Sequence, residues 1–245
     1  MRPSSRRSSL RRATWMALVV LSGVGFLPLF GGPGYEAALA AGVLLPALAA
    51  VATAFDARDA EPFAAFSRGV VSGAWLAGLG LAITWLHGIR VGFCDPVEGA
   101  ELYVLGPGAG AVLGGVWGAV VGVWSSLRQA RRGAPGSRAV VVMAALAAPF
   151  AGIVVSFLRF YTSPMVFAFD PFFGFFAGTL YDSVITGMGR LVTYRAGSLA
   201  TLLATGALAF ALRRQESGVL RLEWRSHPGA TALAVVAALA SLLHT

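Results

Sequence analysis

The sequence predicts an all-α protein built as a polytopic transmembrane helix bundle, and three observations lead to that prediction. The chain is 57% hydrophobic and only 12% charged, with a mean hydropathy of +0.73, so it is far more apolar than a typical soluble domain. Apolar stretches long enough to cross about 30 Å of hydrocarbon recur along it. One stretch carries a glycine at every fourth residue, a packing pattern of membrane helices. We therefore expect six full spans, a short or truncated seventh, and a re-entrant or interfacial aromatic segment.

The expected spans follow one another with short polar connections. A basic cytoplasmic tail covers residues 1–12, and the transmembrane domain covers 13–212. Pro46 and Pro149 lie inside the second and fifth spans and predict kinks or local unwinding. By apolar length the six full spans are 13–30, 35–55, 66–87, 103–124, 139–158 and 196–212.

The two ends of the chain carry further expectations. Residues 5–11 resemble a twin-arginine signal, so a cleaved signal peptide is the alternative to the first span. The long apolar run, and the apolar segments after it, favour a retained signal anchor. Beyond a basic cytoplasmic loop at 213–229, the last piece, 230–245, is short for a span. It stops without a polar tail, which suggests a fragment of a longer protein.

The glycine row lies in the expected fourth span and comprises Gly106, Gly110, Gly114, Gly118 and Gly122. In a soluble helix each glycine would cost about 1 kcal/mol relative to alanine, whereas in lipid such a row lets another backbone approach closely. The third span offers a similar face at Gly69, Gly73 and Ala77. We favour the fifth span as the partner, because a short loop makes it an antiparallel neighbour. Its small-residue face comprises Ala144, Ala148, Gly152 and Ser156.

The distribution of arginines predicts the orientation in the membrane. All 19 basic residues are arginine, and basic residues in short loops favour the cytoplasmic side. With a cytoplasmic N-terminus, only Arg90, Arg159, Arg190 and Arg195 lie outside. The formal charge of +8 therefore reflects topology rather than a nucleic-acid partner. Contact with anionic lipid is a secondary role for the basic loops.

The outer loop at 159–195 is the second informative region, since it is too long and too apolar for an ordinary connection. Seven of the 16 phenylalanines lie between Phe160 and Phe176. Asp170 followed by Pro171 predicts a helix start, with the aspartate as N-cap and the proline in the first helical position.

This aromatic segment has two readings. A re-entrant or interfacial helix at 165–187 keeps the arginine asymmetry intact, whereas a true span there would weaken it. We favour the first reading. The other outer loop repeats the Asp-Pro pattern at Asp95 and Pro96, which predicts a second capped helix start.

The loop also resembles a known group of sequences. The phrase Phe169-Asp170-Pro171-Phe172-Phe173-Gly174-Phe175-Phe176-Ala177-Gly178-Thr179-Leu180-Tyr181-Asp182, with Leu191-Val192-Thr193-Tyr194-Arg195, resembles a motif in uncharacterised myxobacterial-type multi-spanning membrane proteins. In some of these the membrane region precedes a metallopeptidase-like domain, and the resemblance implies that this chain carries the membrane region. The candidate functional residues of the loop are Asp170, Pro171, Gly174, Gly178, Tyr181, Asp182, Arg190 and Arg195.

Catalytic chemistry is weakly represented. Tyr181-Asp182 resembles half of the intramembrane aspartyl protease signature, but the Gly-x-Gly-Asp half is absent from the chain. Such an enzyme needs two carboxylates in one site, and on one helix Asp170 would lie about 120° away from Asp182. We therefore expect Asp182 to pair with Arg190 or Arg195.

Metal chemistry is equally weak. The outer cluster His87, Cys94, Asp95, Glu98 and Glu101 contains metal-ligand types, but its spacing matches no zinc template. A zinc metallopeptidase would also need a His-Glu-x-x-His pair, and the three histidines of the chain are isolated. The sequence predicts no catalytic residue, no metal and no cofactor.

These observations favour an anchoring or scaffold domain in a bacterial inner membrane, multi-pass with a cytoplasmic N-terminus. Its expected partners are the lipid bilayer and a second copy or another membrane protein, bound through small-residue helix faces. On this hypothesis the aromatic loop 160–182 docks a partner, a downstream domain or the bilayer surface. The alternative is a small-solute transporter or channel, which needs intramembrane polar groups that the expected spans largely lack. An intramembrane enzyme is third.

Overall fold

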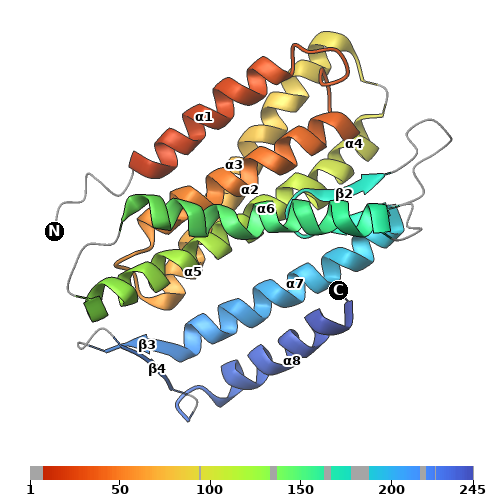
Figure 1. Ribbon diagram of the computed structural model, residues 1–245. Coiled ribbons are helices and arrows are strands. Elements are labelled where there is room, and N and C mark those ends of the chain that lie inside the picture. The colour runs from red at the N-terminus through yellow and green to blue at the C-terminus, as the bar shows by residue number, and fades with distance from the viewer. Residues whose placement is uncertain are drawn as a thin grey trace.

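The computed structural model describes residues 8–93, 95–132, 137–162, 167–177, 188–215, 219–223 and 225–244 of the chain. Figure 1 shows one helical bundle, with an antiparallel pair of helices, α7 and α8, along one side of it. In chain order the elements are α1 (Ser8–Val24), α2 (Tyr35–Asp56), α3 (Pro62–Val91), α4 (Pro96–Tyr103), the π-helical turn η1 (Val104–Gly108), α5 (Ala109–Arg132), α6 (Arg138–Thr162), β1 (Phe167–Asp170), β2 (Gly174–Ala177), α7 (Met188–Ala211), β3 (Leu212–Arg214), β4 (Leu220–Leu222) and α8 (Pro228–His244).

Four helical stretches of the described chain are long and apolar enough to cross a membrane: α2, α3, the continuous helix Pro96–Arg131, and α6. The expected total of six full spans and a seventh is not confirmed. The first expected span stops early, because α1 ends at Val24 after 17 residues. The sixth begins early, at Met188, and its first turns carry Arg190 and Arg195, which lower its hydropathy.

Local sequence signals explain where the central helices begin and continue. The predicted start at Asp95 is confirmed: Pro96 opens α4, and the Asp95 carboxylate accepts the N–H groups of Val97 and Glu98, both at 3.0 Å. Helix α4 then runs through η1 into α5. Pro107 lies inside η1, where a wider turn accommodates a residue that has no N–H to donate.

Helix α5 packs tightly against α2 along the glycine row. A methyl group added at Gly114 would collide with the backbone of Pro46, and one at Gly118 with the backbone of Ala50. One at Gly122 would lie 2.8 Å from the carbonyl oxygen of Ala54. The part of the row from Gly114 to Gly122 therefore faces α2, which presents a matching face with the same four-residue spacing, and the predicted pairing with α6 is wrong.

A second face of α5 packs against α3. Gly115, next to the row, meets the backbone of Gly69, and Gly73 meets the backbone of Ala111. Helix α6 instead contacts α5 through Trp117, whose indole N–H donates to the carbonyl oxygen of Ala144 at 3.1 Å. Close backbone contact on two sides thus holds α5 between α2 and α3.

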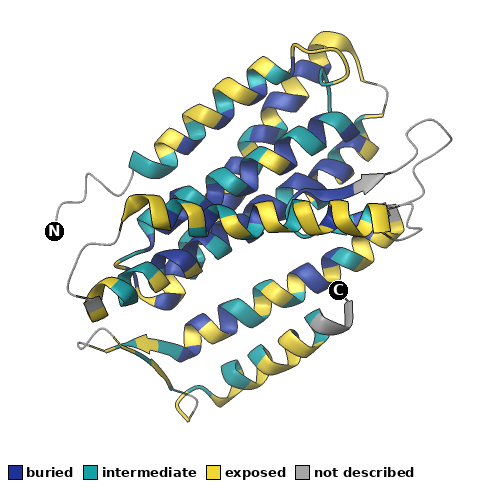
Figure 2. Ribbon diagram, in the orientation of Figure 1, coloured by how far each residue is buried: buried dark blue, intermediate teal, exposed yellow. Residues whose placement is uncertain are grey.

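The buried core lies along α2, α3 and α5, whereas α1, α6 and α8 expose much of their surface (Figure 2). Leu45, Leu76 and Tyr103 are fully buried in the largest apolar cluster. On the outside, α6 exposes Met143 and Val154. A broad apolar exterior of this kind suits a lipid environment.

Candidate functional site

Residues 167–177 of the aromatic loop fold as a β-hairpin. Strands β1 and β2 pair antiparallel, with Phe167 opposite Ala177 and Asp170 opposite Gly174. The predicted helix start at Asp170-Pro171 is therefore wrong, because Asp170 ends a strand and Pro171 begins a turn. Gly174 closes that turn with φ of 109°, a left-handed conformation that side chains disfavour.

The turn of this hairpin inserts into the bundle at the Gly106 end of the glycine row. Glycines from three helices make the space for it. A methyl group at Gly42 of α2 would lie 2.8 Å from the Cα of Phe173, and one at Gly110 of α5 would collide with the carbonyl of Phe172. A methyl group at Gly152 of α6 would collide with the Asp170 carboxylate in the same way. Gly110 and Gly152 thus pack against the hairpin and not, as predicted, against another helix.

Asp170 holds the turn in shape from a fully buried position. Its Oδ1 atom accepts the N–H of Phe172 at 2.7 Å and that of Phe173 at 2.9 Å. Its Oδ2 atom accepts the hydroxyl of Ser156 on α6 at 3.3 Å. Burial raises the pKa of Asp170, while these hydrogen bonds and the charge of Arg195 lower it.

Arg195 of α7 joins the hairpin to η1. Its side chain is 7% exposed, and its Nη1 atom donates to the carbonyl oxygen of Pro171 at 2.7 Å. The Nη2 atom donates to the carbonyl oxygen of Gly106 at 3.1 Å, and Nε donates to that of Leu105. The guanidinium therefore donates to two carbonyl groups of η1 and to one of the hairpin turn.

Aromatic contacts fix the hairpin to α2 and α7. Phe169 stacks on Tyr194 with ring centroids 5.4 Å apart, and Phe175 lies 5.5 Å from Tyr35. The side chains of Phe173 and Phe175 are only 5% and 3% exposed. Phe173 and Phe175 therefore belong to the core and cannot form a docking surface, and docking through other residues of the loop stays a prediction.

The structure brings together Asp170, Pro171, Gly174 and Arg195 of the predicted loop residues. Arg190 lies apart, exposed on the first turn of α7. Gly178, Tyr181 and Asp182 lie outside the described residues, so pairing of Asp182 with an arginine stays a prediction.

Sequence reasoning missed the contribution of η1 to this site. The signal was present, since Pro107 stands between two glycines where a regular helix loses hydrogen bonds. Ser156 was predicted as a packing residue and is instead a hydrogen-bond donor to the turn.

Within the described residues, no group of three or more His, Cys, Asp or Glu side chains is placed to hold an ion. Cys94 lies outside them. His87 is buried against Phe26, with ring centroids 5.0 Å apart and edge-to-face geometry. Its surroundings are those of a packed aromatic residue.

Two cavities lie between α7 and the bundle. One of about 470 Å³ is bordered by Tyr103, Arg195 and Ser198 near the hairpin. The other, of about 240 Å³, lies farther along α7 and has an almost entirely apolar lining that includes Phe66, Trp124 and Leu208. No family model, curated protein or solved structure matches the chain.

Proposed function

We propose that this protein is an integral membrane scaffold of a bacterial inner membrane, whose rigid bundle anchors associated protein segments in the bilayer. The observation that carries the proposal is that the two buried charged side chains, Asp170 and Arg195, both bind backbone groups of the protein itself. Asp170 binds the backbone of its own turn, and Arg195 binds the carbonyl groups of two other elements. Charged groups inside a membrane protein mark either function or internal pairing, and here they hold backbone segments together.

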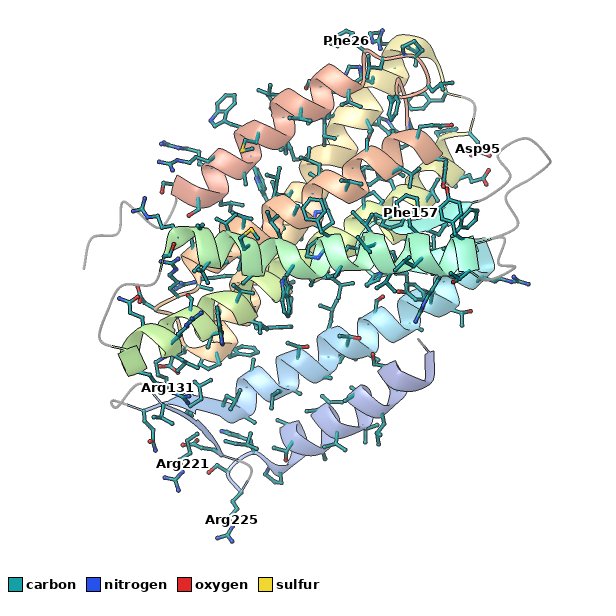
Figure 3. All side chains as sticks on the ribbon, viewed as in Figure 1. Phe26, Asp95, Arg131, Phe157, Arg221 and Arg225 are labelled. Carbon is teal, nitrogen blue, oxygen red and sulfur yellow. The ribbon has the colours of Figure 1, made fainter. Side chains whose placement is uncertain are left out.

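The proposed topology has a cytoplasmic N-terminus and six crossings, formed by α1, α2, α3, the helix from α4 to α5, α6 and α7, with α8 as a short seventh. The arginine distribution supports this orientation. Arg131, Arg221 and Arg225 lie at the opposite end of the molecule from Phe26 and Asp95 (Figure 3). In Figure 1 the start of α1 and the strands β3 and β4 also share that basic end.

A small-solute transporter is the second candidate, and one observation favours it. The 470 Å³ cavity borders Arg195, Ser198 and a π-turn, and π-turns are frequent at functional sites. Its lining is otherwise nearly all apolar, whereas transporters present polar groups at a central site. The apolar lining of this cavity therefore agrees better with a scaffold than with a transporter.

Crosslinking and flux measurements separate the two candidates. A benzophenone side chain is placed at one exposed apolar position per face, at Val19 of α1, Met143 of α6 or Val236 of α8. A scaffold is expected to give one discrete protein adduct from one face in native membranes. The same protein in vesicles loaded with pyranine is expected to pass protons and potassium ions no faster than protein-free vesicles. Flux above that background, lost in Arg195→Gln, together with lipid adducts alone at all three faces, would favour the transporter.

A further inference from the structure

A third cavity, of about 660 Å³, lies at the basic end of the bundle and is independent of the hairpin site. It is bordered by the first turns of α1 and α6 and by the end of α2 with the loop that follows it. Helices α1 and α6 each pack against α2 and scarcely against each other. The cavity therefore opens between α1 and α6. Its polar wall includes Ser8, Ser9, Arg12, Arg58, Asp59 and Arg138.

Three arginines line this cavity, and one of them has buried nitrogen atoms without an acceptor in the described part of the chain. Arg12 and Arg138 are exposed. Arg58 lies over the ring of Phe55, 4.6 Å from the ring centroid, and its Nε and Nη2 atoms are buried without a hydrogen-bond partner among the described residues. Burial, and next the charge of Arg138, lower the pKa of Arg58, while Asp59 raises it. A buried guanidinium nitrogen without an acceptor is costly.

The carboxylates at this cavity do not meet that need. Asp56 accepts the hydroxyl of Ser9, and no ion pair joins it or Asp59 to an arginine in the described residues. The cavity border thus carries three arginines and two aspartates, a surplus of positive charge. Arg138 also opens α6, where the unpaired N–H groups of a helix N-terminus disfavour a cation and favour an anion.

The cavity lining also has an apolar part. It includes Ala13 and Met16 of α1, Leu48 and Val51 of α2, and Val142 of α6. A free phosphate ion would use the basic wall alone, whereas an amphiphile with an anionic head group would use both walls. Basic pockets between membrane helices on the cytoplasmic side suit the head groups of anionic lipids.

We propose that this cavity binds an anionic phospholipid of the cytoplasmic leaflet. The guanidinium groups of Arg12, Arg58 and Arg138 surround its phosphodiester, and one acyl chain lies along Met16 and Val142. Guanidinium groups bind phosphate oxygens through paired, charge-assisted hydrogen bonds. The site rests on the membrane orientation proposed above and is independent of the scaffold role.

The test uses the full-length protein, purified in detergent and stripped of lipid, with native mass spectrometry as the readout. Phosphatidylglycerol, phosphatidylethanolamine and inorganic phosphate are titrated separately. Phosphatidylglycerol is expected to bind, and Arg138→Gln and Arg58→Gln are each expected to weaken it by about tenfold. Arg221→Gln is the matched control, since Arg221 is exposed on β4 at the same end of the molecule, and it is expected to leave binding unchanged.

The choice of variants keeps the outcome clear. Arg138 is exposed, so its replacement leaves the packing intact and the result does not depend on whether Arg58→Gln folds. Val142→Trp keeps all three arginines, fills the apolar wall, and is expected to weaken phosphatidylglycerol binding as well. Unchanged binding in Arg138→Gln, or equal loss in Arg221→Gln, would overturn the site. Equal binding of both lipids, or displacement of the lipid by inorganic phosphate, would overturn its assignment to an anionic lipid.

Discussion

The guanidinium of Arg195 donates to the carbonyl oxygen of Pro171 at 2.7 Å, and this contact joins the last part of the chain to the turn of the hairpin. The same side chain reaches Gly106 at one end of the glycine row. One residue therefore connects three segments that local structure alone would leave independent. The arrangement leads to four predictions.

Arg195→Met is expected to destabilise the protein by about 3 kcal/mol, because it keeps the apolar stem but removes the donors to three carbonyl groups. Thermal unfolding of the purified protein in detergent measures the loss. Arg190→Met is the matched control on the same helix, where the side chain is exposed, and it is expected to unfold like the wild type. An equal effect of both changes would show that Arg195 does not hold the hairpin in place.

Asp170→Asn is expected to reduce the pH dependence of stability. Burial raises the pKa of this carboxyl group, so the folded state binds the proton more tightly than the unfolded state does. The contribution is fully present below the unfolded pKa, about 3.9, and is lost as the pH rises through the higher folded pKa. Unfolding of the two proteins is compared from pH 4 upwards.

The comparison has an internal control. Asparagine keeps an oxygen that accepts the N–H groups of Phe172 and Phe173, whereas Asp170→Ala removes it. The alanine variant is therefore expected to be the less stable of the two at every pH. A steeper pH profile for Asp170→Asn than for the wild type would contradict the assignment.

Gly118→Leu is expected to force α5 away from α2, because its side chain would collide with the backbone of Ala50. Overpacking of this kind costs about 1–3 kcal/mol and can prevent folding altogether. Gly78→Leu is the control, since nothing lies within 4 Å of a Cβ at that position. Folding yield and thermal unfolding in detergent are measured for both variants. Similar values for the two would argue against the close contact of α2 and α5.

Gly174→Ala is expected to destabilise the hairpin by about 1–2 kcal/mol, since φ is 109° there and an L-residue is strained in that region. A Cβ would also lie 3.0 Å from the Cα of Gly106. Gly189→Ala, with open space around it, serves as the control. Hydrogen exchange at the amides of β1 and β2 measures the local stability of the hairpin. Unchanged protection in Gly174→Ala would contradict the predicted destabilisation.

The sequence predicted well what depends on neighbouring residues. The capped helix start at Asp95 depends on hydrogen bonds to N–H groups two and three residues further along the chain, and the structure confirms it. The Asp-Pro pair at Asp170 was ambiguous, because a carboxylate accepts the same two N–H groups in a helix cap and in a tight turn. The positive φ of Gly174 resolves it, and no local pattern marked that glycine.

Pairing between helices was less predictable. The glycine row indicated close packing but not its partner, and the nearest helix along the chain was the wrong choice. The residues that meet the row, such as Ala50 and Ala54, belong to an alanine-rich helix. Their spacing did not stand out from the alanines around them.

By itself the sequence determined that this is a helical protein with an apolar exterior, basic connections at one end and one tightly packed glycine helix. Those properties follow from composition, hydrophobic length and four-residue spacing, which act over short stretches of chain. Only the tertiary structure decided that the row from Gly114 to Gly122 faces α2 and that Arg195 reaches Pro171. It also decided that Arg58 and Arg138 meet at one cavity. These contacts join residues far apart in the chain, so no short stretch of sequence specifies them. Close packing of small residues sets the first, and the pairing of buried donors with acceptors sets the second.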